Sequence, residues 1–192
     1  NPESIPCHIL MVEYYYDKAD QENLSSEITM LMDLLSTNSQ DQVFALLAIF
    51  DNNKDYASVI KYADDILKKA PNYYREIDFL ALKAALLTKD MVNVEKYNKG
   101  VAQFELVLTA SERSLFLASK YLLLQNQAEV LSSEQLELIQ NVDSLSIYPQ
   151  LFLYSYYQKE GDAQMMESIK LRALELDFYK EIPDSFFIDV IE

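Results

Sequence analysis

Apolar residues recur along this chain at helical spacing, in runs that come in pairs. The run over residues 56–72 places its apolar side chains along one stripe of a helix and ends near a proline, Pro71. The run over residues 161–177 repeats this plan, and each run follows another amphipathic stretch, over residues 43–50 and 151–157. The pattern therefore predicts a structure built from pairs of helices. The apolar positions of the first of these runs are Val59, Ile60, Tyr62, Ala63, Ile66 and Leu67.

The paired runs repeat at a nearly constant interval. An acidic or amide residue occupies the predicted turn inside each pair, at Asp20, Asp55, Asp90, Asn126 and Asp162, so successive turns are 35, 35, 36 and 36 residues apart. A period of this length is typical of helical repeats that stack on their neighbours. It predicts five helical hairpins and a final helix over residues 184–192, which caps the array or is itself truncated. The predicted hairpins cover residues 8–38, 40–71, 74–106, 111–142 and 147–179.

Several residues match positions that are characteristic of one repeat family. Tyr56 and Pro71 match in the second unit, and Gly161 and Asp162 match in the last. Across residues 8–180 the chain resembles a divergent member of the tetratricopeptide repeat family. The resemblance implies an all-α fold in which residues 1–192 form one domain, a right-handed superhelical array of about five antiparallel helix hairpins, or α-solenoid.

The chain departs from the family pattern in places. Val59 and Ile66 replace small residues, and Phe178 stands where the last unit would have a proline. The fourth unit departs most, because serines interrupt its second helix. Ser132 followed by Gln135 is a capping-box pattern, which predicts that this helix begins late.

The composition favours the same fold class and limits the partners. The chain has 2 glycines and 5 prolines among 192 residues, too few for the turns of a β-rich protein. Its formal net charge of −15 opposes binding to nucleic acids and anionic membranes, which attract clustered Lys and Arg. No apolar run approaches the roughly 20 residues of a bilayer-spanning helix, so direct membrane insertion is not expected. A protein or peptide partner with basic and apolar side chains fits better.

The residues that catalysis usually requires are scarce. The two glycines lie 61 residues apart, which excludes glycine-rich phosphate-binding loops. His8 and Cys7 are the only residues of their types, so neither a Cys/His zinc site nor a convincing Ser-His-Asp triad can be assembled. The neighbouring Asp64 and Asp65 are interpreted as solvated charges on a helix. We therefore expect no catalytic residue, no metal site and no cofactor.

The resemblance also implies a binding surface. Tetratricopeptide arrays hold their ligands on a concave side that the first helix of each hairpin lines. Here that surface combines apolar anchors with six carboxylates and a single arginine, which suits a basic and apolar segment, although the same carboxylates also fit a merely solvated face. Family members that hold acidic tails have Lys, Asn and Arg where this chain has Ile9, Glu13, Phe44 and Ala48, so that activity is not expected here. The predicted groove residues are Ile9, Glu13, Tyr16, Asp17, Asp41, Phe44, Asp51, Asn52, Arg75, Asp78, Leu82, Glu112, Leu115, Ser119, Tyr148, Leu151, Ser155 and Gln158.

Two functions fit such a surface. The first is a non-catalytic scaffold or adaptor that binds a peptide or helix of a partner protein. The alternative is a peptide-sensing domain of a bacterial transcriptional regulator, whose helical-repeat design the chain also resembles, although these residues contain no basic helix-turn-helix. We expect a cytoplasmic protein, with export left open by the start at Asn1, and homo-oligomer formation is also left open.

Overall fold

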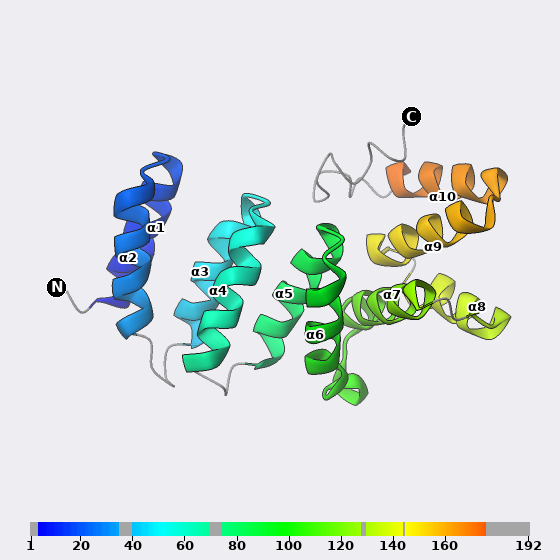
Figure 1. Ribbon diagram of the computed structural model, residues 1–192, viewed down its shortest axis with the longest axis horizontal. Coiled ribbons are helices and arrows are strands. Elements are labelled where there is room, and N and C mark those ends of the chain that lie inside the picture. The colour runs from blue at the N-terminus through cyan, green and yellow to red at the C-terminus, as the bar shows by residue number, and fades with distance from the viewer. Residues whose placement is uncertain (1–3, 35–39, 70–73, 128–129, 144, 176–192) are drawn as a thin grey trace. The chain divides into compact units, whose positions relative to one another are not determined.

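A computed structural model describes residues 4–34, 40–69, 74–127, 130–143 and 145–175, and these residues form ten α-helices, one short 3₁₀ helix and no strand (Figure 1). The prediction of an all-α chain is confirmed for this part of the sequence. The predicted final helix over residues 184–192 lies outside the described residues, as do Pro71 and Phe178. In chain order the elements are α1 (Ile5–Asp17), α2 (Gln21–Leu34), α3 (Gln40–Asn52), α4 (Tyr56–Lys69), α5 (Tyr74–Leu87), α6 (Met91–Ala102), η1 (Glu105–Val107), α7 (Ala110–Asn126), α8 (Ser133–Asn141), α9 (Ile147–Glu160) and α10 (Ala163–Glu175).

The chain divides into two compact units, unit 1 over Asn1–Leu80 and unit 2 over Ala81–Glu192, with the boundary inside α5. In unit 1, α1 packs against α2 and α3, and α3 packs against α4. In unit 2, α6 packs against α7, α7 against α9, and α9 against α10, while the short α8 touches both α7 and α9. Helices close in sequence thus bury one another's apolar stripes, which is a repeat-like mode of packing. The superhelical array, the single domain over residues 1–192 and the hairpin bounds stay predictions.

One turn design recurs between consecutive helices, and the α3–α4 turn illustrates it. Lys54 follows α3 in the left-handed conformation, with a φ of 58°. Its N–H donates to the carbonyl of Asp51 at 3.0 Å, and the N–H of Asp55 donates to the carbonyl of Phe50 at 2.9 Å. These two hydrogen bonds form the Schellman closure of a helix C-terminus. Asp55 then caps α4, because its Oδ1 accepts the N–H of Ser58 at 3.2 Å.

The same turn joins α1 to α2, α5 to α6 and α9 to α10. In each, a left-handed residue precedes an aspartate that caps the next helix, which confirms four of the five predicted turn residues. Two hydrogen bonds from Asn23 hold the pKa of Asp20 below its ordinary value, and the one from the Asn23 side chain has a larger effect than the one from its backbone N–H. The left-handed residues are Ala19, Lys89 and Gly161, with φ of 54°, 55° and 73°. The capping residues Asp20, Asp90 and Asp162 accept the N–H groups of Asn23, Asn93 and Met165 at 3.2, 3.2 and 3.0 Å.

The prediction of a fifth turn at Asn126 is wrong. Asn126 is the last residue of α7, and Gln127 after it has φ −84° and ψ 9°, so Gln127 is not left-handed, unlike the residue before the aspartate in the other four turns. Helix α8 begins instead after Ser132, whose Oγ accepts the N–H of Gln135 at 3.2 Å. In return, Oε1 of Gln135 accepts the N–H of Ser132 at 2.9 Å. This capping box confirms the predicted late start of the helix.

We expect glycine to stabilise the protein at the left-handed positions that lack it. A side chain in this conformation costs about 1–2 kcal/mol, which glycine avoids while losing more backbone entropy on folding. Lys54→Gly and Lys89→Gly should therefore each raise the free energy of unfolding by about 0.5–1 kcal/mol. Gly161→Ala should lower it through backbone strain alone, because no atom of the described residues lies within 4 Å of the added Cβ. Urea denaturation followed by circular dichroism measures these changes.

The control for this series is Lys96→Gly, which introduces glycine inside α6. Glycine in a helix interior is less favourable than other residues by about 0.5–1 kcal/mol, so this variant should lose stability. A loss of stability in Lys54→Gly and Lys89→Gly as well would contradict the view that these two lysines are strained.

Phe50 of α3 lies at the centre of the core of unit 1, where it is 1% exposed. The ring of Tyr16 on α1 meets the Phe50 ring edge-on, with the centroids 5.5 Å apart, and Tyr62 of α4 stacks on it at 5.2 Å. Three helices therefore meet at this side chain. The other buried residues of unit 1 include Val12, Leu31, Leu46, Leu47, Val59, Ala63 and Ile66.

In unit 2 a buried hydrogen-bond network joins α6 to α7. The side chain of Asn98, 8% exposed, donates from Nδ2 to the Phe116 carbonyl at 3.1 Å and to Ser119 Oγ at 2.7 Å. Ser119 Oγ in turn donates to the same carbonyl at 2.9 Å. Small residues let the helices of this unit approach closely, and four of them are fully buried, namely Ala81, Ala84, Ala85 and Ala118.

Candidate functional site

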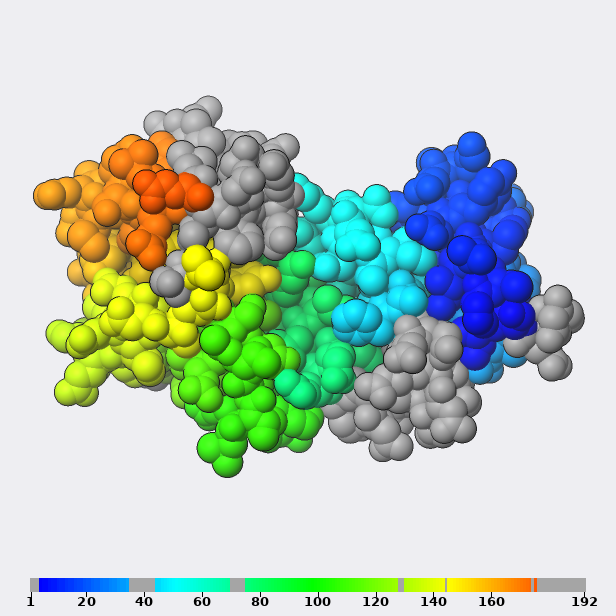
Figure 2. Space-filling view, turned by 180° about the vertical axis from the view of Figure 1, so that it is seen from behind, coloured from blue at the N-terminus to red at the C-terminus, as the bar shows by residue number. Residues whose placement is uncertain are grey.

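Some of the residues that were predicted to line the groove lie on α1 and α3 of unit 1. Glu13 and Asp17 are exposed and lie one helical turn apart on α1. Phe44 and Asn52 on α3 are also exposed. Because α1 packs against α3, these side chains lie on neighbouring helices, and α1 is visible at the surface in dark blue (Figure 2). Asp41 belongs to α3, but its side chain lies outside the described residues. The name α1–α3 face is used below for Ile9, Glu13, Tyr16, Asp17, Phe44, Asp51 and Asn52.

Tyr16 connects this face to the core and to the α3–α4 turn. Its hydroxyl donates to Oδ2 of Asp55 at 3.5 Å, while its ring contacts Phe50. Burial raises the pKa of Tyr16 above its ordinary value, and the nearby charges of Asp55 and Asp17 raise it further. The phenol is therefore neutral at physiological pH and cannot serve there as a base. The face consequently combines half-buried aromatic surface with carboxylates.

The structure corrects the prediction for five other groove residues, whose side chains are buried. Leu82 and Ser119 are 0% exposed, and Ser119 is occupied by the network with Asn98. These five residues therefore pack the interior and offer no surface to a partner. They are Asp78, Leu82, Leu115, Ser119 and Leu151.

The remaining predicted groove residues lie on α5, α7 and α9. Glu112 caps its own helix, because its Oε2 accepts the N–H of Thr109 at 2.8 Å. The backbone carbonyl of Ser155 accepts a hydrogen bond from Nε2 of Gln125 at 3.5 Å. Gln158 is exposed near the end of α9. Arg75 on α5 and Tyr148 on α9 are half-buried.

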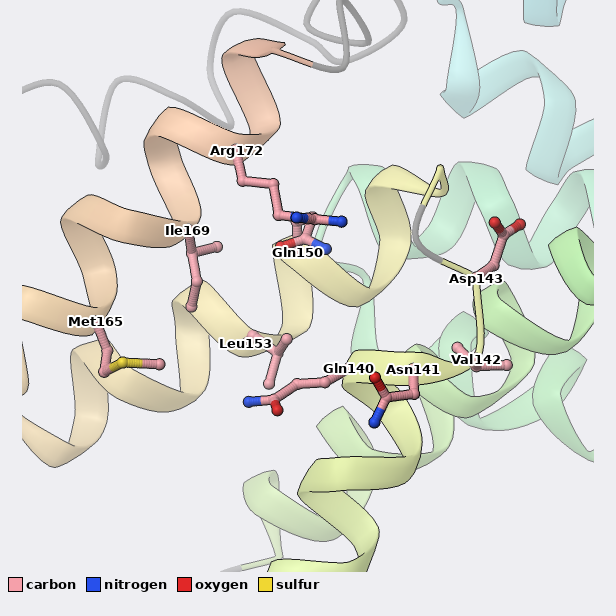
Figure 3. Close-up of a pocket in the computed structure, with 9 residues that line it drawn as sticks. All are labelled: Gln140, Asn141, Val142, Asp143, Gln150, Leu153, Met165, Ile169 and Arg172. Carbon is pink, nitrogen blue, oxygen red and sulfur yellow. The ribbon is translucent and has the colours of Figure 1, made fainter.

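A cavity of about 620 Å³, hereafter the α8–α10 cavity, opens in unit 2 (Figure 3). The end of α8, the connection to α9, and helices α9 and α10 surround it. Figure 2 shows that α8, in yellow-green, and α10, in orange, both reach the surface. The residues lining the cavity are Gln140, Asn141, Val142, Asp143, Gln150, Leu153, Met165, Ile169 and Arg172.

The polar groups of this cavity differ in how they are engaged. Asp143 accepts the N–H of Leu145 at 3.0 Å, and Asn141 donates to the Glu137 carbonyl at 2.9 Å. Gln150 is only 4% exposed, and its side-chain amide makes no hydrogen bond with the part of the chain that the structure describes. Buried amides are rarely left without a partner, so Gln150 is the unusual group of this cavity.

Sequence reasoning did not identify this cavity. Met165 and Ile169 were assigned to the apolar stripe of a helix, and Ile169 is indeed buried. The available signal was Gln150, a polar residue inside the otherwise apolar and aromatic start of α9. Arg172, one turn after Ile169, was a second signal, because i and i+3 positions share a helix face.

A smaller hollow of about 360 Å³ lies between α2 and α4. Its lysines have partners: Lys69 lies 2.8 Å from Oδ1 of Asp33, and Lys68 lies 3.1 Å from Oδ1 of Asp65. Lys61 lies over the ring of Tyr62, 4.7 Å from its centroid. Surface pairs of this kind contribute little energy and are ordinary features of a solvated helix face, as was predicted for Asp65.

Within the described residues, no helix is long and apolar enough to cross a bilayer, and no cluster of three or more His, Cys, Asp or Glu side chains is arranged to hold a metal ion. Comparison of the chain with protein-family models, with curated proteins and with solved structures found no match.

Proposed function

We propose that this protein is a non-catalytic interaction module that binds a basic and apolar segment of a partner protein on the α1–α3 face. The observation that carries the proposal is the turn that recurs four times with the same backbone closure and the same aspartate cap. Repetition of one structural unit is typical of proteins that build extended binding surfaces. In the proposed arrangement, about five antiparallel hairpins of the tetratricopeptide type form a right-handed superhelix.

The charge of the α1–α3 face supports a basic ligand. Glu13 and Asp17 are exposed on it, Asp51 is half-buried, and the whole chain has a net charge of −15. A negative field of this kind attracts cationic segments and speeds their association. Phe44, 43% exposed, adds an apolar anchor.

The chemistry of the same face favours binding over catalysis. Its tyrosine is held neutral, because burial and the charge of Asp55 raise the pKa of Tyr16, and Glu13 and Asp17 are exposed on a helix surface. A general acid or base requires a group whose pKa is close to the working pH. A surface of charges and aromatic rings is better suited to holding a ligand in place.

The test is a titration with a helical peptide that carries Lys and Arg along one edge and Leu along its apolar face, followed by calorimetry. Glu13→Lys should weaken binding about tenfold, which corresponds to 1.4 kcal/mol. The matched control is Glu22→Lys on α2, an exposed glutamate whose replacement changes the net charge equally. The affinity of Glu22→Lys for the peptide should stay within about twofold of the parent affinity, once salt has screened the long-range attraction between the charges.

Equal weakening by Glu13→Lys and Glu22→Lys would show that only net charge matters and would refute a site on the α1–α3 face. The absence of measurable heat with the basic peptide, in a protein whose circular dichroism is helical, would refute the proposed function itself.

A further inference from the structure

We propose that the α8–α10 cavity is a second binding site, which takes an extended peptide segment with its backbone amide on Gln150, an aliphatic side chain against Leu153 and Ile169, and one carboxylate on Arg172. This ligand differs in charge from the basic segment proposed for the α1–α3 face. The inference does not depend on that first site.

Gln150 provides the recognition of the peptide backbone. A glutamine side chain offers both a carbonyl acceptor and N–H donors, which are the groups that complement a peptide unit. The Gln150 side chain is 4% exposed, lines the cavity and makes no hydrogen bond within the described chain. A ligand that pairs with this amide forms hydrogen bonds that the described part of the chain does not supply.

The apolar side of the cavity suits an aliphatic side chain. Leu153 is 3% exposed and Ile169 is 7% exposed, and Met165 lies one helical turn before Ile169 on α10. Methionine adapts its shape to a neighbour, because its chain is unbranched. The volume of about 620 Å³ falls within the range of roughly 300–1,000 Å³ that is usual for ligand sites.

Arg172 selects a carboxylate. Its guanidinium has five N–H donors in a planar fork, a geometry that matches the two oxygens of a carboxylate. Figure 3 places Asp143 apart from Arg172, and Oδ1 of Asp143 is engaged by the N–H of Leu145 at 3.0 Å. Because the chain carries a net charge of −15, a ligand with one carboxylate fits better than a polyanionic one.

The experiment uses the full chain labelled with ¹³C at its methionine methyl groups and the blocked peptide acetyl-Ala-Leu-Glu-Leu-Ala-amide. The methyl resonance of Met165 should shift on titration, while those of Met11 and Met30 in unit 1 should not move. Fluorescence anisotropy of a labelled copy of the peptide gives the affinity. An unmoved Met165 resonance at millimolar peptide would overturn the proposal.

Two variants test the assigned contacts. Gln150→Met keeps the side-chain volume and removes the amide. It should leave the protein folded and weaken peptide binding about tenfold. The control is Gln164→Met, an exposed position on α10 outside the cavity, which should bind as the parent does. Parental affinity in a folded Gln150→Met would overturn the role of the amide.

Arg172→Gln tests the carboxylate separately. The parent should prefer the Glu peptide to its Gln counterpart about tenfold, and Arg172→Gln should abolish this preference without abolishing binding of the Gln peptide. An unchanged preference would overturn the role of Arg172. Glu13→Lys should leave all of these affinities essentially unaltered, so failure of the α1–α3 site and failure of the cavity site are distinguishable.

Discussion

Replacement of Phe50 by alanine is expected to lower the free energy of unfolding by about 3–5 kcal/mol, the largest effect among the substitutions considered. The ring is 1% exposed and contacts the aromatic rings of Tyr16 and Tyr62, so its removal both exposes a cavity and breaks two aromatic contacts. Urea denaturation monitored by circular dichroism measures the loss. Because α1, α3 and α4 meet at this ring, the damage should extend beyond a single helix.

Phe44 is the matched control, since it is a phenylalanine of the same helix that is 43% exposed. Phe44→Ala should change the free energy of unfolding by about 0.5 kcal/mol or less, as is usual at a surface position. Phe44→Ala should also weaken binding of the basic peptide at the α1–α3 face. Equal destabilisation by the two substitutions would contradict the assignment of Phe50 to the core and of Phe44 to the binding surface.

Asn98→Ala should lower the free energy of unfolding by about 1–3 kcal/mol. The substitution removes two buried hydrogen bonds between α6 and α7 and leaves the hydroxyl of Ser119 without its donor. A double-mutant cycle with Ser119→Ala isolates the interaction between the two side chains, which should be coupled by at least about 0.5 kcal/mol. Additive effects would show that Asn98 stabilises the protein only through the space it fills.

The two proposed sites use opposite charge chemistry in one acidic chain. The α1–α3 face presents carboxylates to a cationic ligand, whereas the α8–α10 cavity presents Arg172 and an amide to a ligand with a single carboxylate. A basic segment should therefore not compete with the acidic peptide for the cavity. This difference allows the two sites to be measured independently in the same protein.

The starts of several helices could be predicted because their signals are local in sequence. An aspartate side chain that accepts the N–H three residues later needs no distant partner, so Asp20, Asp55, Asp90 and Asp162 act as caps wherever the rest of the chain lies. The capping box of Ser132 is equally local. Asn126 misled the prediction because spacing alone suggested a turn, while Asn126 itself ends α7 and Gln127 after it is not left-handed.

The exposure of individual residues could not be predicted in the same way. A helical repeat indicates which residues share a face, but not whether another helix covers that face. Leu82 and Ser119 were assigned to a groove by their register and are buried. Ser119 lies on α7, against which both α6 and α9 pack. Gln150 was not recognised as a candidate site residue, because it lies in a run of apolar and aromatic residues that is typical of a buried helix.

The sequence by itself determined the all-helical class of the described residues, four of the turns and the starts of five helices, because apolar spacing and capping hydrogen bonds act within a few residues of one another. Only the tertiary structure decided which predicted groove residues are exposed, that Asn98 and Ser119 form a buried network, and that Gln150 and Arg172 line one cavity. These features depend on helices that are distant in sequence coming into contact, and burial is a property of that contact rather than of the residue.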